Sequence, residues 1–230
     1  MLFSRTPQIN RGNRDEPYAA LPWEDLDSLF TAMLGDLLES VSQGDFADVL
    51  LYRDASELSD DFLGKLREKI DIRNVSEGSF SEQVQQAIET VFSQGYDRVV
   101  AILDNHPLIT SEMIRKVFDQ LGYEDDCVVV GPTMEGKYFL LGMKSSHSEV
   151  FDITEGNPMT NSNLLLERLC RTNAILFPIT MSYALDSGFN LARLKKELDA
   201  LGSNNVSFPH RTHEIFKTFD KKYRTRKSTR

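Results

Sequence analysis

The chain has 230 residues and a mass of 26.2 kDa, and its 40% hydrophobic and 27% charged residues suffice to build a folded core. This composition excludes a generally disordered or collagen-like chain, and no apolar run reaches the roughly 18–20 residues that span a bilayer. The net charge is −9, of which the segment Lys217–Arg230 contributes +6, so the other residues carry −15. This acidic remainder argues against a broad nucleic-acid surface, because phosphate binding needs a basic face.

Short apolar runs, typical of strands buried on both faces, alternate along the chain with amphipathic stretches typical of helices. In chain order we expect a helix over Trp23–Val41, a strand over Ala47–Tyr52, a helix over Ser81–Phe92, a strand over Asp97–Leu103, a helix over Thr110–Leu121, strands over Cys127–Val130 and Tyr138–Met143, a helix over Leu164–Cys170, a weaker strand over Ala174–Ile179 and a helix over Leu191–Leu201. Strands separated by helices imply crossover connections. The sequence therefore predicts a three-layer α/β/α sandwich with a mainly parallel sheet.

The two cysteines and the basic segment complete the general description. Cys127 and Cys170 both lie in apolar contexts, so we expect buried free thiols, which suits a reducing cytoplasm. The segment Lys217–Arg230 holds seven basic residues and one acidic residue. Such a segment is typical of a frayed, solvated end, although it also suits contact with RNA, a membrane or a partner protein.

Polar residues follow the predicted strands where a ligand site is expected. In α/β sheets of this kind, ligands bind beyond the carboxyl ends of the strands. Asp104 follows the strand over Asp97–Leu103, and Glu135 follows the strand over Cys127–Val130. Asp186 follows the last strand region. A carboxylate at such an edge can hold a divalent cation that neutralises a diphosphate leaving group. Asp104 and Asn105 are equally typical of a simple turn before the next helix.

The stretch from residue 95 to 144 resembles a known family. Its second half, GPTMEGKYFLLG, keeps Gly131, Pro132, Gly136 and Tyr138 of the pattern G-P-x-x-D-G-G-Y-x-L-x-G. That pattern is the one found in a bacterial family of small GT-A-type glycosyltransferases labelled radical-SAM/selenodomain-associated transferases, which this chain resembles. Their fold is that of nucleotide-diphospho-sugar transferases. The resemblance implies a GT-A-like transferase domain over residues 1–202, with residues 203–230 as a C-terminal extension.

The chain departs from the family pattern at its metal and sugar positions. Where the family has G-T-D-S-P, alignment on Pro107 puts Asn105 at the Asp position, with Asp104 before it and His106 after it. An amide is a weaker ligand for Mg²⁺ or Mn²⁺ than a carboxylate, so Asp104 and His106 would have to contribute. Where the family has D-G-G-Y, the chain has Glu135 and Lys137 around Gly136.

The phosphate-binding and late acidic elements are altered as well. The family's N-terminal K-x-P-x-x-G-x-x-K-T-R-L becomes a stretch that keeps Pro7, replaces Lys with Arg5 and loses K-T-R, although Arg11 and Arg14 remain for phosphate binding. The late D-x-D-T element keeps only its second acid, as Asp186.

Two functions follow from the resemblance and these departures. The first is a glycosyl- or nucleotidyltransferase that uses a nucleotide-sugar or nucleotide donor with Mg²⁺ or Mn²⁺ and an acceptor that the sequence does not identify. The second is a catalytically impaired protein of the same fold that acts as a binding or regulatory module. In the first, the expected roles are catalysis by Glu135 and Asp186, metal binding by Asp104, Asn105 and His106, and nucleotide or phosphate binding by Arg5, Pro7, Arg11, Arg14, Gly131, Gly136 and Tyr138.

Overall fold

The computed structural model describes residues 1–4, 18, 21–53, 70–103, 106–145, 147–152, 154, 158, 161–202 and 207–227. The chain divides into two compact units. Unit 1 comprises Met1–Arg5, Asp45–Asp104 and Glu112–Ala184, and unit 2 comprises Thr6–Gly44, Asn105–Ser111 and Leu185–Arg230. The boundary expected after residue 202 stays a prediction.

Unit 1 contains a seven-stranded sheet in the order β3-β2-β1-β4-β6-β5-β7. Its strands are β1 (Leu2–Phe3), β2 (Val49–Arg53), β3 (Ile70–Asn74), β4 (Val99–Ile102), β5 (Cys127–Pro132), β6 (Tyr138–Met143) and β7 (Ile175–Pro178). Strand β6 runs antiparallel to both neighbours, and the other pairs are parallel. The prediction of a mainly parallel sheet is therefore confirmed.

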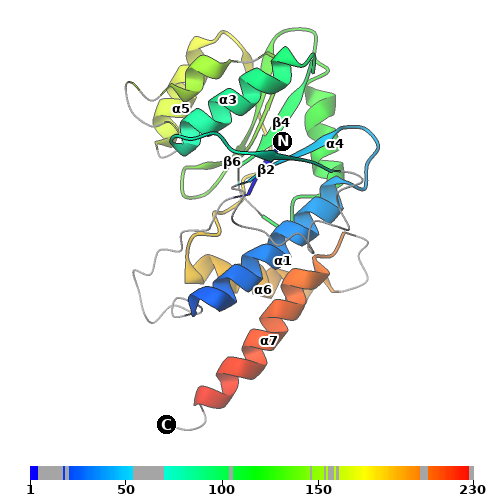
Figure 1. Ribbon diagram of the computed structural model, residues 1–230, viewed down its shortest axis with the longest axis vertical. Helices are drawn as coiled ribbons and strands as arrows, with labels where there is room; N and C mark the ends of the chain where they lie inside the picture. Colours follow the sequence, from blue (N-terminus) through cyan, green and yellow to red (C-terminus); the bar gives the residue numbers. More distant parts are fainter. Residues whose placement is uncertain are drawn as a thin grey trace. The chain divides into compact units, whose positions relative to one another are not determined.

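Helices cover both faces of this sheet (Figure 1). Helices α3 (Phe80–Ser93) and α5 (Ser162–Arg171) join the short 3₁₀ helix Ser148–Phe151 in one apolar cluster with alternate residues of β4, β5 and β6. Helix α4 (Ser111–Gln120) lies against the opposite face, where Val117 packs beside Gly142 of β6. The period-two alternation of a strand explains this division, because successive side chains point to opposite faces. The expected three layers are thus present in unit 1.

Helix α3 begins where its sequence provides a cap. The Ser79 hydroxyl accepts the N–H of Glu82, and the Glu82 carboxylate accepts the N–H of Ser79 at 2.7 Å. These hydrogen bonds from Ser79 lower the pKa of Glu82. Such a reciprocal capping box satisfies two N–H groups that a helix start otherwise leaves without acceptors.

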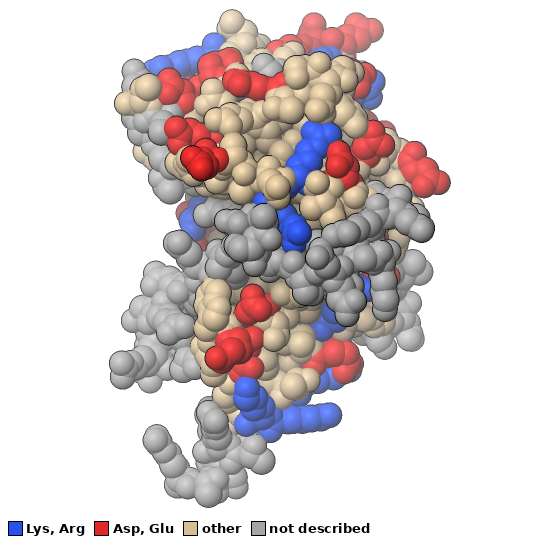
Figure 2. Space-filling model, in the orientation of Figure 1, with Lys and Arg blue, Asp and Glu red and all other residues tan. Residues whose placement is uncertain are grey.

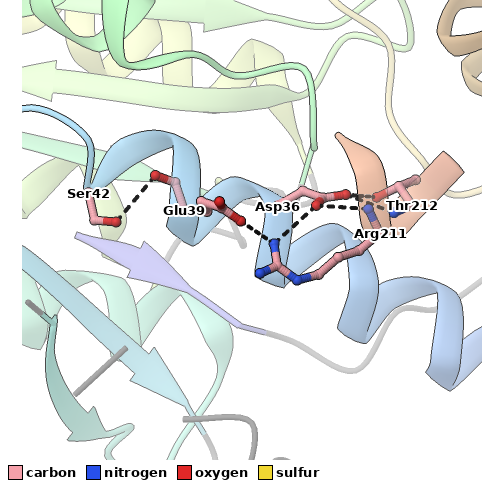
Figure 3. Close-up of polar contacts among 5 residues, drawn as sticks. All are labelled: Asp36, Glu39, Ser42, Arg211 and Thr212. Carbon is pink, nitrogen blue, oxygen red and sulfur yellow. Dashed lines mark hydrogen bonds and ion pairs between the residues drawn. The ribbon is translucent and has the colours of Figure 1, made fainter. Parts of the chain in front are cut away.

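Unit 2 contains the helices α1 (Trp23–Val41), α6 (Gly188–Leu201) and α7 (His210–Lys227). Helices α1 and α7 pack together, and the buried carboxylate of Asp36 on α1 accepts the N–H groups of Arg211 and Thr212 in the first turn of α7 (Figure 3). Near the other end of α7, Lys222 bonds to Asp25 at 2.7 Å. Helix α1 has the bounds that its apolar spacing predicts.

The basic segment is not the frayed end that its composition suggests. Residues 217–227 belong to α7, whose Phe216 and Phe219 are buried and contact the ring of Tyr18. Figure 2 shows basic side chains gathered near the lower end of the view, next to atoms drawn in grey. Aromatic residues three positions apart turn to one side of a helix, which explains why this segment folds.

The cysteines differ from expectation in one respect. Cys127, at the start of β5, is buried and free, as predicted, and burial raises the pKa of its thiol. Cys170 is also free, but it is exposed, so the prediction of burial is wrong for this residue. It lies on the outer side of α5, whereas Leu165 and Leu169 occupy the inner side.

No helix in the described ranges has both the length and the apolar composition needed to cross a bilayer.

Candidate functional site

The turn between β5 and β6 forms the best-defined part of the candidate site. The N–H of Thr133 donates to the carbonyl of Lys137 at 2.7 Å, and the Thr133 hydroxyl accepts the N–H of Lys137 at 3.1 Å. Gly136 has φ +74°, a left-handed conformation that costs glycine little because it has no Cβ. The predicted role of Gly136 in nucleotide binding is not tested by this geometry, which gives the residue a conformational role in the turn.

The segment after β7 lies beside this turn. Thr133 and Ser182 form a parallel bridge, and the N–H of Met134 donates to the carbonyl of Ser182 at 2.9 Å. The carboxylate of Glu135 accepts the N–H of Ala184 at 2.8 Å. Residues 133–135 of the turn and residues 182–184, which follow β7, are therefore adjacent.

Glu135 is exposed, and its bond to Ala184 ties the two segments together. A carboxylate held by a backbone N–H is well placed to fix a loop. Sequence reasoning identified Glu135 but missed Ala184, because a backbone donor leaves no signature in the amino-acid sequence. The apolar residues Tyr183, Ala184 and Leu185, all buried, anchor the segment that carries this donor.

The spacing of small residues in GPTMEGKYFLLG has a packing explanation. A Cβ on Gly131 would lie 2.9 Å from the ring of Phe139, and a Cβ on Gly142 would lie 2.7 Å from Cγ1 of Val117. The ring of Tyr138 is partly buried against the apolar cluster of unit 1, and this burial raises the pKa of its hydroxyl. These positions thus serve the sheet and its contact with α4, whatever they contribute to a ligand.

We expect Gly142→Ala to lower the free energy of unfolding by roughly 1–3 kcal/mol, since the added methyl group overpacks the contact with Val117. Urea unfolding measures this loss. In the double variant Gly142→Ala/Val117→Ala the clashing methyl group is gone, so the combined loss should be smaller than the sum of the two single losses. Strict additivity would contradict the packing explanation.

The proposed metal-binding residues fall partly outside the described residues, which exclude Asp104 and Asn105. His106 belongs to unit 2 and is 3% exposed, and its Nδ1 accepts the N–H of Leu108 at 3.3 Å. Burial lowers the pKa of His106 to about 4, with smaller electrostatic effects of Glu197 and Arg193 on α6. The imidazole is therefore neutral and engaged in a local turn. Among the described residues, no three acidic, histidine or cysteine side chains group together as a metal site requires.

The remaining predicted residues are distributed as follows. Asp186 lies in unit 2, half-buried, just before Ser187, whose hydroxyl caps α6 by accepting the N–H of Asn190. The phosphate-binding candidates Arg5, Pro7, Arg11 and Arg14 follow β1 but lie outside the described residues. Their roles stay predictions.

Comparisons with known proteins agree with the fold. The family model described as "Uncharacterized protein conserved in bacteria (DUF2064)" matches residues 37–155. No curated protein sequence matches significantly. A proposed nucleotide-diphospho-sugar transferase from Desulfovibrio desulfuricans G20 has a TM-score of 0.75 at 20% identity, over 97% of this chain and 95% of that one.

Two further solved structures are more distant. A cytidylyltransferase from Leptospira borgpetersenii serovar Hardjo-bovis (strain JB197) has a TM-score of 0.52 at 16% identity, covering 81% of this chain and 83% of its own. A 4-diphosphocytidyl-2C-methyl-D-erythritol synthase from Anaerococcus prevotii DSM 20548 has a TM-score of 0.52 at 11% identity, covering 86% and 94%. At these identities the likeness establishes a shared fold, and the activity has to be argued from the site.

Proposed function

The chain belongs to the DUF2064 family, and we propose that it is a transferase that takes a glycosyl or nucleotidyl group from a nucleotide-activated donor. The observation that carries the proposal is the placement of the β5–β6 turn. This turn lies at the carboxyl edge of a sheet of the nucleotide-diphospho-sugar transferase fold. The hydrogen bond between Glu135 and Ala184 joins the turn to the segment that follows β7. The motif around Gly131 and Gly136 further supports membership of the branch labelled radical-SAM/selenodomain-associated transferases.

The order of the strands supports a phosphate site at the same edge. Strand β1 lies between the parallel strands β2 and β4, with Leu2 opposite Ile102. The segments that follow β1 and β4 therefore start at neighbouring points of the carboxyl edge, where α/β proteins bind nucleotides. We assign the donor diphosphate to Arg5, Arg11 and Arg14 of the first segment, because guanidinium groups match phosphate oxygens in geometry and charge.

A divalent cation fits this proposal through Asp104 rather than through His106. The described position of His106 is buried and locally bonded, whereas a carboxylate is the ligand that Mg²⁺ and Mn²⁺ prefer. Asp104, with the amide of Asn105, would hold the cation, which when bound would offset the charge of the diphosphate leaving group.

We propose that Glu135 positions the donor by fixing the turn to Ala184, and that Asp186 contacts the acceptor. The variant Glu135→Gln separates positioning from proton transfer, since the amide oxygen of glutamine still accepts the N–H of Ala184 but does not take a proton at neutral pH.

Two free cysteines, one of them exposed, suit our placement of the protein in the cytoplasm.

The test is a thermal-shift screen with UDP, GDP, CDP, dTDP and their sugar conjugates, each with and without Mg²⁺ or Mn²⁺. Ligand at a hundredfold excess over Kd stabilises the native state by roughly 2.7 kcal/mol, which raises the Tm by several degrees for a chain of this length. We expect a cation-dependent shift with one nucleotide, and we expect Asp104→Ala to abolish the cation dependence while leaving the Tm without ligand unchanged.

Two results would count against this proposal. Binding of the nucleotide and cation by Asp104→Ala with unchanged affinity would remove Asp104 from the metal site. No Tm shift with any nucleotide would favour the alternative, a binding or regulatory module that has kept the fold. The sequence indication for this alternative is Asn105, which stands where the family pattern has Asp.

A further inference from the structure

A cavity of about 800 Å³ lies within unit 1 at the edge of the sheet opposite to the β5–β6 turn. The segments that precede β2 and β4 form part of its wall, and the side of α4 closes it. It is lined by Met1, residues 45–48, Leu50, Val91 and residues 96–100, and by Arg115, Phe118, Asp119 and Gly122. The amino group of Met1 donates to the carbonyl of Val100 at 2.8 Å, and burial lowers its pKa to about 5. The proposed transferase site uses none of these residues.

The lining of the cavity combines apolar and aromatic side chains with charged ones. Leu50, Val91, Val99 and Val100 are buried at its floor. The rings of Phe46 and Phe118 meet edge to face with centroids 6.0 Å apart, although Phe46 is still 40% exposed. The partly exposed ring of Phe46 offers a flat surface for a ligand.

The rim of the cavity carries an excess of negative charge. Four aspartates line it against two arginines. Asp48 accepts a hydrogen bond from the Tyr96 hydroxyl at 2.7 Å, which fixes one carboxylate above the aromatic wall. Arg98 lies 3.8 Å from Asp97, so one of the two cations is directed to an acid of the same rim. Asp45, which precedes β2, and Asp119, on α4, both line the cavity and are exposed.

We propose that this cavity binds a small organic cation, an ammonium or guanidinium group on an aromatic or aliphatic body. The apolar floor and the rings of Phe46, Tyr96 and Phe118 would take the body, and the rim aspartates would take the charge. Aromatic faces attract a cation in addition to the carboxylates, so both parts of the lining favour the same ligand class.

The test uses 2-phenylethylammonium as a probe, with its neutral analogue 2-phenylethanol and its anionic analogue 3-phenylpropionate as matched comparisons. Isothermal titration calorimetry measures the three affinities on the full chain. We expect the cation to bind, and the alcohol and the carboxylate to bind roughly fivefold or more weakly, because the alcohol carries no charge and the four aspartates outnumber the two arginines that could attract the carboxylate.

Variants separate binding in the cavity from general attraction to an acidic protein. We expect Asp45→Asn/Asp119→Asn, which changes two exposed rim acids, to weaken binding roughly fivefold or more. The control Glu77→Gln/Asp125→Asn changes the net charge equally at exposed positions outside the cavity and should leave the affinity within about twofold. Phe46→Ala should weaken the binding of the cation without changing the Tm of the free protein by more than a degree or two.

Equal weakening by the control pair would overturn the proposal, since the attraction would then belong to the whole acidic surface. Absence of binding, or equal affinity for the three probes, would also overturn it. Because the cavity shares no residue with the proposed transferase site, these results do not depend on whether the chain binds nucleotides.

Discussion

Replacing Asp36 by alanine is expected to lower the free energy of unfolding by about 3 kcal/mol, one of the two largest effects that we predict. The Asp36 side chain is 4% exposed, and its two oxygens accept four hydrogen bonds from the start of α7 (Figure 3). The donors are the N–H and guanidinium of Arg211, at 3.1 and 3.3 Å, and the N–H and hydroxyl of Thr212, at 2.8 and 2.7 Å.

The expected loss is large because the variant leaves buried donors without their acceptor. The first N–H groups of a helix have no partner within the helix, and an acidic group there also interacts favourably with the helix dipole. Asp36 therefore caps α7 from a different helix, 175 residues away from Arg211 in sequence. Asp36→Asn keeps the shape but loses the charge and one acceptor, so an intermediate loss is expected.

Glu39→Ala is the matched control, since Glu39 contacts the same guanidinium of Arg211 from an exposed position. An exposed ion pair contributes at most about 1 kcal/mol. Urea unfolding gives the global effect, and hydrogen exchange at the N–H groups of Arg211 and Thr212 gives the local one. Similar losses for Asp36→Ala and Glu39→Ala would show that Asp36 contributes only as a surface charge.

The capping by Asp36 also explains why α7 was not predicted from sequence. The segment His210–Lys227 is rich in lysine and arginine, and its start signal lies on α1 rather than beside it in the chain. The apolar spacing of Ile215, Phe216, Phe219 and Tyr223 was a local indication of a helix. Long helices with a strong apolar stripe, such as α1, were predicted with their observed bounds, because their pattern contains the reason for their burial.

Strands were predictable to the degree that both of their faces are buried. Strand β4 and strand β5 are continuous apolar runs and were found with small shifts at the ends. Strand β3 is an edge strand that pairs only with β2 and alternates Ile70, Asp71, Ile72 and Arg73, so its pattern was too polar for the same rule. Strand β1 has only two residues and is defined by its neighbours on both sides rather than by its own length.

The candidate site shows the same limit at the level of single residues. The motif GPTMEGKYFLLG predicted a turn at the carboxyl edge, and the turn is there. The hydrogen-bond partner of Glu135 was not predictable. Its carboxylate accepts a hydrogen bond from the main-chain N–H of Ala184, whose position depends on the fold of residues 182–184. A sequence pattern thus identifies where polar groups gather more readily than what each of them contacts.

The second large effect concerns pH and His106. Burial lowers the pKa of this imidazole from its ordinary value of 6.5 to about 4 in the folded chain. Between these two values the unfolded chain binds a proton that the folded chain does not, so acid favours unfolding. The contribution of His106 to stability is therefore complete above pH 6.5 and falls as the pH drops toward 4, by about 2 kcal/mol between pH 7 and pH 5.

Urea unfolding of the native chain and of His106→Gln at pH 7 and pH 5 tests this expectation. The variant has no group to titrate at this position, so its stability should fall by about 2 kcal/mol less than that of the native chain over the same interval. An NMR titration of the His106 ring provides the direct reading, with no change of charge in the folded protein until the pH approaches 4. Titration of the ring near 6.5 would mean that the imidazole is hydrated in the folded chain, and would make it accessible to a cation beside Asp104. The pH dependence of stability thus decides whether His106 belongs to the packing of unit 2 or to the metal site that its sequence position suggested.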